Sequence, residues 1–315
     1  MKNLKRVVAL SVFSIVIQSS LAVAREGVLV LAHGSAMDHF TFQAGDLPSN
    51  KSQCELIHEH FIKEGSVHDK PCETAICDVT GAAAKVIGEP LEVAFGMFSL
   101  ASFQHAVNRL GNQQIDTLKI IPFYISSASG VIRQQKYMFD VFKKFMNDPK
   151  IVLPKSITKV IFQGAMDQDI ELTAVLAKRS QELSANPQKE EVILVAHGPV
   201  QQKDDDIWLR DLAVHGERIQ NDRLKTQSHF FGIHAFTLKD DAPPEERDQR
   251  TKELRELVSQ INARGNRPLI LPVLVASGGI ENGLLRRLEG LSFHYLGHML
   301  APDPELVQWI ISRAR

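Results

Sequence analysis

The sequence lacks the features that membrane-spanning and nucleic-acid-binding proteins need. Beyond residue 24, no apolar run approaches the roughly 20 residues that span a bilayer, so we expect a soluble mature protein without stable membrane insertion. The chain has 36 Lys and Arg against 37 Asp and Glu, and no basic block. Nucleic-acid-binding surfaces carry such a block, so nucleic acid is not an expected partner.

Cysteine is also scarce. Cys54, Cys72 and Cys77 are the only three, and they fall within one short stretch. They lack the Cys-x-x-Cys spacing that is usual for a zinc site, which disfavours a metal-thiolate centre. In an oxidising compartment one disulfide is expected, with Cys72 and Cys77 the closest pair in sequence, although any of three pairings can form.

The first 24 residues have the pattern of a secretory signal peptide. Lys2, Lys5 and Arg6 form a basic start, residues 7–17 are apolar, and residues 22–24 read Ala-Val-Ala, a cleavage pattern. We expect cleavage before Arg25 and a periplasmic or secreted protein. No cysteine lies at the cleavage site, so a lipoprotein anchor is not expected. Loss of the three basic residues leaves 33 against 37 acidic ones, a formal net charge of −4.

Two hydrophobic segments end in nearly the same way. Residues 28–34 read Val-Leu-Val-Leu-Ala-His-Gly, and residues 192–198 read Val-Ile-Leu-Val-Ala-His-Gly. Shorter strings recur in the same order, namely Phe-Gly at 95 and 231, Ile-x-Pro at 120 and 270, and Asp-x-Glu-Leu at 169 and 303. Ordered matches over a long period indicate an internal duplication.

Hydrophobic strands alternate with amphipathic helices in both halves. The expected strands are residues 28–32, 91–96, 118–125 and 160–163, then 192–196, 230–235, 269–275 and 293–296; the expected helices have apolar faces around Phe103, Leu172, Leu254 and Trp309. Such alternation forms parallel sheets. We therefore expect an α/β fold of two similar lobes, each a parallel sheet flanked by helices, over residues 25–188 and 189–315.

The first half contains an insertion at about residues 36–80. His33 and Phe95 are 62 positions apart, whereas His197 and Phe231 are 34 apart. A loop of this length is either functional or partly disordered. It holds the three cysteines and four histidines: His39, His58, His60 and His68. The sequence His58-Glu59-His60 could bind a metal, but an exposed polar helix shows the same pattern, and we favour the helix.

The repeated segments deliver His33 and His197 to the carboxyl ends of strands, where open parallel sheets bind ligands. A neutral imidazole can bind divalent iron, cobalt, nickel or zinc, and it can also accept a proton near neutral pH. The same edge is predicted for further candidates in the second half: His234, Asp240, Asp241 and His298. His234 equally suits a buried core position.

Small residues follow the third strand of each half. Ser126, Ser127, Ser129 and Gly130 in the first half, and Ser277 and Gly278 in the second, could offer amide donors to the carboxylates of a ligand. The same residue types also cap helices. Both interpretations stay open at the level of the sequence.

The strand ending in Ala32-His33-Gly34, the segment 93–97 and the run Ile120 to Ser127 resemble the class II chelatases, which include the sirohydrochlorin cobaltochelatases and ferrochelatases. The resemblance covers Gly27 to Ile311 apart from the insertion. It implies insertion of a divalent metal, cobalt or iron with nickel or zinc as alternatives, into a tetrapyrrole such as sirohydrochlorin. The metal is a substrate, and no organic cofactor is implied.

The resemblance further implies that His33 binds the incoming metal and accepts protons from the macrocycle, in a cleft between the lobes. His197 and His234 are then the further candidate metal ligands. The family usually carries a second histidine after the third strand, but residues 126–130 and 276–280 contain none. Either another residue replaces it, or the protein binds metal or tetrapyrrole without turnover. The sequence carries no indication of the oligomeric state.

Two hydrolase classes are disfavoured. An α/β-hydrolase needs a Gly-x-Ser-x-Gly nucleophile turn, and no serine here has a glycine at both of those positions. A histidine phosphatase would carry arginine before the histidine, where this chain has Ala32 and Ala196.

Overall fold

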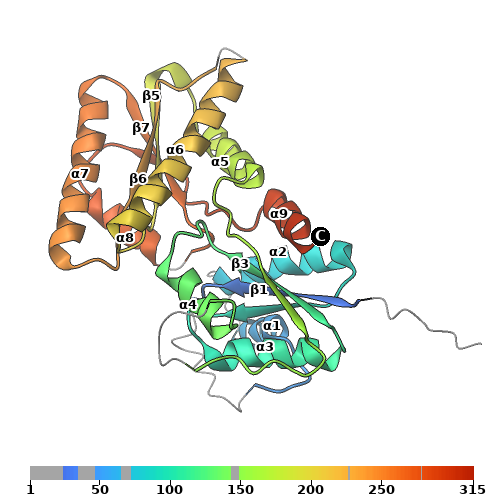
Figure 1. Cartoon of the computed structure of the whole chain (residues 1–315). Coiled ribbons are helices and arrows are strands. Elements are labelled where there is room, and N and C mark those ends of the chain that lie inside the picture. The colour runs from blue at the N-terminus through green and yellow to red at the C-terminus, as the bar shows by residue number, and fades with distance from the viewer. Residues whose placement is uncertain (1–23, 35–46, 65–71, 143–148, 226–227, 278) are drawn as a thin grey trace, which may run out of the picture.

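The computed structural model describes residues 24–34, 47–64, 72–142, 149–225, 228–277 and 279–315. This part of the chain forms two lobes, each built on a four-stranded parallel sheet (Figure 1). In spatial order, sheet A contains β2 (Leu91–Phe95), β1 (Glu26–Ala32), β3 (Thr117–Phe123) and β4 (Lys159–Phe162), and sheet B contains β6 (Gly232–Thr237), β5 (Glu190–Ala196), β7 (Arg267–Val273) and β8 (His294–Tyr295). The expected two-lobed α/β fold is confirmed.

Helices connect the strands. In chain order they are α1 (Gln53–Glu64), α2 (Cys72–Ile87), α3 (Leu100–Asn112), α4 (Gly130–Met138), α5 (Ile170–Leu183), α6 (Gln202–Leu224), α7 (Pro244–Ala263), α8 (Ile280–Arg287) and α9 (Pro304–Ala314). No helix among the residues described is both long and apolar enough to cross a membrane.

Alternating side chains give the strands β1, β3, β5 and β7 two buried faces, as a parallel sheet covered by helices requires. In β1, Val28 and Val30 enter one cluster, while Leu29 and Leu31 enter another that includes residues of α3. The first cluster continues without a break into sheet B, where it includes Val192 and Leu194 of β5, and therefore joins the two lobes through one apolar core.

The lobes exchange helices. α5 follows sheet A in sequence but packs against β7 and α6 of the second lobe, whereas α9 ends the sequence and packs against α2 and β3 of the first lobe (Figure 1). Trp309 of α9 is fully buried, and its ring lies 5.7 Å from that of Phe123. Division of the chain into domains at residue 188 stays a prediction. Each half of the sequence contributes a helix to the other lobe, so the lobes do not coincide with the two halves of the sequence.

A buried lysine secures the carboxyl end of α9. The ammonium of Lys119, on β3, donates to the carbonyl oxygens of Ala314 and Arg315 at 2.6 and 3.1 Å. It also forms an ion pair with Glu26 at 2.5 Å. The start of β1 and the end of α9 are thereby brought to the same side chain.

The segment predicted as an inserted loop is partly helical, since it contains α1 and the first half of α2. His58 lies on α1, in agreement with the helical interpretation of that sequence. The signal-peptide prediction falls almost entirely on residues outside the described part of the chain, as does His39.

The disulfide joins Cys54 to Cys77, which is one of the three pairings that the sequence leaves open and is not the closest pair in sequence, Cys72 and Cys77. Cys72 and Cys77 lie on the same helix, α2, five positions apart, which separates the two positions by about 140° around its axis. Cys54 instead belongs to α1, which packs against α2 and brings the Cα atoms of Cys54 and Cys77 to 5.6 Å. Packing between the helices decides the pairing.

The helix exchange predicts that Trp309→Ala is strongly destabilising. Truncation leaves a cavity beside Phe123 in the core shared by both lobes and removes the indole N–H donor to Asp169. We expect the free energy of unfolding in urea to fall by about 3–5 kcal/mol. Gln308→Ala, at an exposed position one residue away on α9, should change it by less than about 0.5 kcal/mol. Equal effects of the two substitutions would contradict this packing.

Candidate functional site

His33 and His197 follow the two strands at which the sheet topology reverses. β1 pairs with both β2 and β3, and β5 pairs with both β6 and β7, so each histidine lies at the carboxyl end of a strand next to a topological switch point. Ligands of open parallel sheets bind at such points. The duplicated sequence therefore places one imidazole at the corresponding position in each lobe.

A glycine holds the turn after β5. Gly198 has φ of +75°, and a Cβ on it would lie 2.6 Å from Cβ of Thr237, so a side chain there is excluded by both conformation and space. The tight turn lets Nδ1 of His197 donate to the carbonyl oxygen of Gly198 at 2.8 Å. Nε2 then carries the lone pair, which is the atom that can bind a metal or accept a proton.

The two histidines interact electrostatically across the lobes. The pKa of His33 is lowered, chiefly by loss of hydration and next by the charge of His197, while the carbonyl of Gly34 opposes the shift. The side chain still reaches solvent. His33 is therefore exposed at the carboxyl end of β1, and its lowered pKa favours the neutral imidazole near neutral pH.

Two carboxylates accompany the histidines. Asp241 lies 3.5 Å from Nε2 of His197, and the charges of Asp241 and of Glu73 both act on His33. Asp241 was expected from the sequence, whereas Glu73, buried in the first turn of α2, was not. Within the described residues, no three His, Cys, Asp or Glu side chains form a ready-made metal cage.

The structure does not bring His234 to this site. His234 pairs with Ile193 in the register of β6 against β5, four residues before His197, so its expected position at the strand end is wrong. Its Nε2 lies 2.8 Å from the carboxylate of Glu191, which also binds Arg264 and Asn266. The sequence pattern placed the end of β6 too early, because β6 continues to Thr237.

Asp240 and His298 have other partners. Asp240 forms an ion pair with Arg287 of α8. His298 is exposed, with Nδ1 3.9 Å from the carboxylate of Glu182 at the end of α5.

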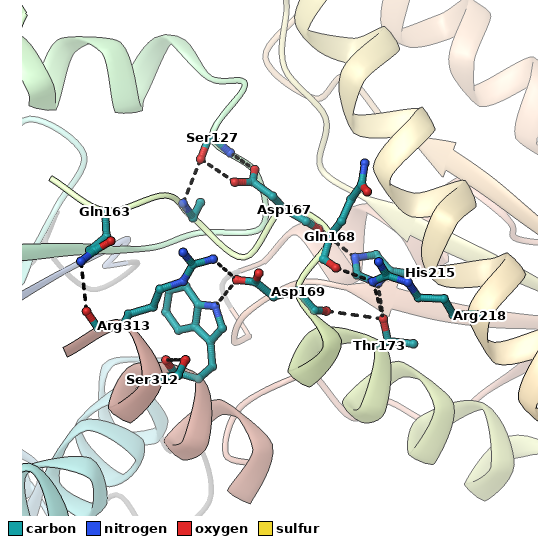
Figure 2. A network of polar contacts seen from close by, with 12 residues as sticks. Ser127, Gln163, Asp167, Gln168, Asp169, Thr173, His215, Arg218, Ser312 and Arg313 are labelled. Atoms are coloured by element: carbon teal, nitrogen blue, oxygen red, sulfur yellow. Dashed lines mark hydrogen bonds and ion pairs between the residues drawn. The ribbon is translucent and has the colours of Figure 1, made fainter. Parts of the chain in front are cut away.

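The serines after β3 are bound within the protein. Ser127 donates its backbone N–H and its hydroxyl to the two carboxylate oxygens of Asp167, at 2.6 and 2.7 Å (Figure 2). The buried hydroxyl of Ser126 accepts from Ala128, and that of Ser129 accepts from Val131 as the N-cap of α4, which begins at Gly130. These bonds are those of a turn and a helix cap.

The corresponding loop of the second lobe is more open. Ser277 is exposed, and Gly279, with φ of +99°, begins α8 without a side-chain cap. Gly278 lies outside the described residues. Hydrogen bonds within the protein therefore hold the loop after β3, whereas the loop before α8 is exposed and begins its helix without a side-chain cap.

A polar network joins the Ser127 loop to the second lobe (Figure 2). His215 of α6 is fully buried; its Nδ1 accepts the hydroxyl of Thr173 at 2.7 Å, and its Nε2 donates to the carbonyl oxygen of Asp167 at 2.8 Å. Arg218 donates to the carbonyl of Gln168 in the same turn. A neutral His215 satisfies both bonds, which fixes α6 against the segment between β4 and α5.

This network predicts that stability depends on the protonation of His215. Burial, followed by the nearby charge of Arg218, lowers its pKa below the ordinary 6.5, against the opposing effects of Asp167, Asp211 and Asp169. Between the two pKa values the unfolded chain binds more protons, so the contribution is complete above about pH 6.5 and is lost as the pH falls below it.

The measurement is urea unfolding of the parent and of His215→Gln between pH 8 and pH 5. Glutamine can replace both hydrogen bonds but does not titrate, so the stability difference between the two proteins should shift in favour of the variant as the pH falls. The lowered pKa values of His33 and His105 are common to both proteins and cancel. Curves that stay parallel over this range would rule out the assignment.

Comparison with known proteins gives a likeness of structure. No protein-family model and no curated protein sequence matches this chain. SirB from Bacillus subtilis, solved with Fe3+, is 13% identical with a TM-score of 0.56, and the match covers 92% of this chain and 94% of that one. SirB from Bacillus subtilis subspecies spizizenii, described as a sirohydrochlorin chelatase in complex with cobalt, is 10% identical with a TM-score of 0.50 at the same coverage. The chain has a class II chelatase-like fold.

Proposed function

We propose that the protein inserts a divalent metal ion, cobalt(II) or iron(II), into a tetrapyrrole such as sirohydrochlorin. The observation that carries the proposal is the position of His33 and His197, each directly after a strand at the switch point of its sheet, in a chelatase-like fold. Nickel and zinc are the alternative metals, since imidazole also binds them. No organic cofactor enters the reaction.

In this mechanism the imidazoles hold the incoming metal weakly. The lowered pKa of His33 keeps its ring neutral, and the Gly198 carbonyl engages Nδ1 of His197, which leaves Nε2, 3.5 Å from Asp241, as its metal-binding atom. A site of two imidazoles with nearby carboxylates retains a metal less firmly than a closed cage of four protein ligands. Weak retention suits a metal that has to leave the protein for the macrocycle.

Proton balance gives the acidic side chains a role. Insertion breaks two pyrrole N–H bonds as the metal bonds to the ring nitrogens, so two protons leave for each metal inserted. His33 accepts one of them once the metal has left its lone pair, because a neutral imidazole takes up a proton near neutral pH, and it passes this proton to water before it accepts the second. The negative charges of Asp241 and Glu73 stabilise the resulting imidazolium, as both already favour the protonated form of His33.

A non-catalytic binding protein on the same fold is the second candidate. Two observations favour it: residues 126–130 and 276–280 contain no histidine, and no three metal-binding side chains of the described residues come together. Such a protein would bind metal or tetrapyrrole in stoichiometric amounts. Multiple turnovers distinguish the two functions.

We also propose that the protein is exported and that its signal peptide is removed before Arg25. The basic, apolar and Ala-Val-Ala segments support export. The Cys54–Cys77 disulfide adds support, because stable disulfides are characteristic of oxidising compartments.

The chelatase proposal predicts that the mature protein accelerates the spectral change of sirohydrochlorin on addition of cobalt(II) or iron(II). His33→Ala should lower the rate above background by about a hundredfold, because it removes both a metal contact and a proton acceptor. His294→Ala, which removes an exposed histidine of β8, should leave the rate unchanged. A His33→Ala protein that turns over as fast as the parent would refute the role of His33.

Export predicts a defined amino terminus. Mass spectrometry of the full-length gene product from the periplasmic fraction should give a chain that starts at Arg25 and carries one disulfide. Substitution of Ala22 and Ala24 by bulky residues should block cleavage and retain the precursor. Recovery of the uncleaved chain from the cytosol alone would argue against export.

A further inference from the structure

An ion pair bridges the lobes close to the two switch points. Arg133, in α4 of the first lobe, binds Asp204, in the first turn of α6 of the second lobe, through two parallel contacts of 3.1 and 2.7 Å. The aspartate side chain is 6% exposed, whereas that of Arg133 is 38% exposed. The guanidinium is therefore open to solvent on one side, although it holds a buried carboxylate.

The position of this pair connects both parts of the candidate site. α4 follows the serine loop after β3, and α6 begins at Gln202, shortly after His197. A second bond lies beside it, because the indole N–H of Trp208 donates to the carbonyl oxygen of Ala128 at 2.8 Å. Together the two contacts hold the serine loop of the first lobe against α6 of the second.

The bidentate geometry indicates which chemistry Arg133 recognises. A guanidinium that forms two parallel bonds matches a carboxylate in shape as well as charge. The pair is exposed on the Arg133 side alone, so a ligand carboxylate that takes over the guanidinium has to compensate the buried carboxylate of Asp204 that it displaces. Tetrapyrroles such as sirohydrochlorin carry several carboxylate side chains, and these are the anions expected at this edge.

We propose that Arg133 is a binding residue for a carboxylate of the tetrapyrrole, and that Asp204 occupies it as an internal competitor in the ligand-free protein. This inference rests on the proposed function, because it takes the ligand class from it. Arrival of the macrocycle exchanges one carboxylate for another at Arg133 and releases α6 from α4. The Trp208 bond then remains as the weaker contact between these segments.

The test is fluorescence titration of the mature protein with metal-free uroporphyrin, a stable tetrapyrrole with eight carboxylates. Asp204→Asn removes the competitor and should lower the Kd at least about fivefold, because the ligand then takes the guanidinium without displacing a buried carboxylate. Arg133→Gln should raise the Kd by at least as much. Asp206→Asn, an equal change of charge at an exposed position in the same turn, should leave the Kd unaltered.

Hydrogen exchange measured by mass spectrometry supplies a readout that does not depend on binding. Backbone amides at the start of α6 should exchange faster in Asp204→Asn than in the parent and in Asp206→Asn, because loss of the pair frees this turn from α4 while the shared apolar core keeps the lobes together. Should Arg133→Gln not fold, Arg133→Lys keeps the charge without the parallel bonds and is expected to weaken binding as well.

The outcomes separate this inference from the chelatase proposal. Suppose that the parent binds uroporphyrin, but Asp204→Asn weakens binding as Arg133→Gln does, or neither variant changes the Kd. The ion pair is then structural, and this inference fails while the chelatase proposal stands. If the parent shows no saturable binding, both this inference and tetrapyrrole recognition fail. Opposite shifts of Kd in the two variants support the exchange.

Discussion

The indole of Trp309 packs on Phe123 under sheet A and donates its N–H to Asp169, in the segment that leads to α5. Through this contact the last helix of the sequence completes the apolar core of the first lobe, while α5 covers part of sheet B. Neither sheet is fully covered until both halves of the chain have folded. The relation between His33 and His197 depends on this exchange, since each histidine sits at the end of a strand in a different sheet.

Much of this arrangement can be predicted from the sequence, because it follows from local periodicity. Short apolar runs between amphipathic helices marked all eight strands of the two sheets, and the repeated His-Gly ending indicated equivalent positions for His33 and His197. Strand ends of parallel sheets lie along one edge, so the duplication places each histidine at the ligand-binding edge of its own sheet. The pairing of Asp241 with His197 follows from the same reasoning.

The features that could not be predicted depend on packing between distant elements. The partner of Cys77 is set by the contact of α1 with α2, and no spacing of cysteines carries that information. His234 was misplaced because the two residues that extend β6 beyond Ala235 move it away from the strand end. Glu73 approaches His33 from a helix within the insertion, where no repeat exists to guide the alignment.

Lys119 gives the architecture one more property, since its ammonium contacts both Glu26 at the start of β1 and the carbonyl oxygen of Arg315. Residues at opposite extremes of the described sequence thus meet on one side of sheet A, at the edge away from the histidines. A short peptide linker could join them, and the chain could be reopened in an exposed loop with every strand keeping its neighbours. Topologically, the protein is close to a ring, and a circularly permuted version would present the same two imidazoles.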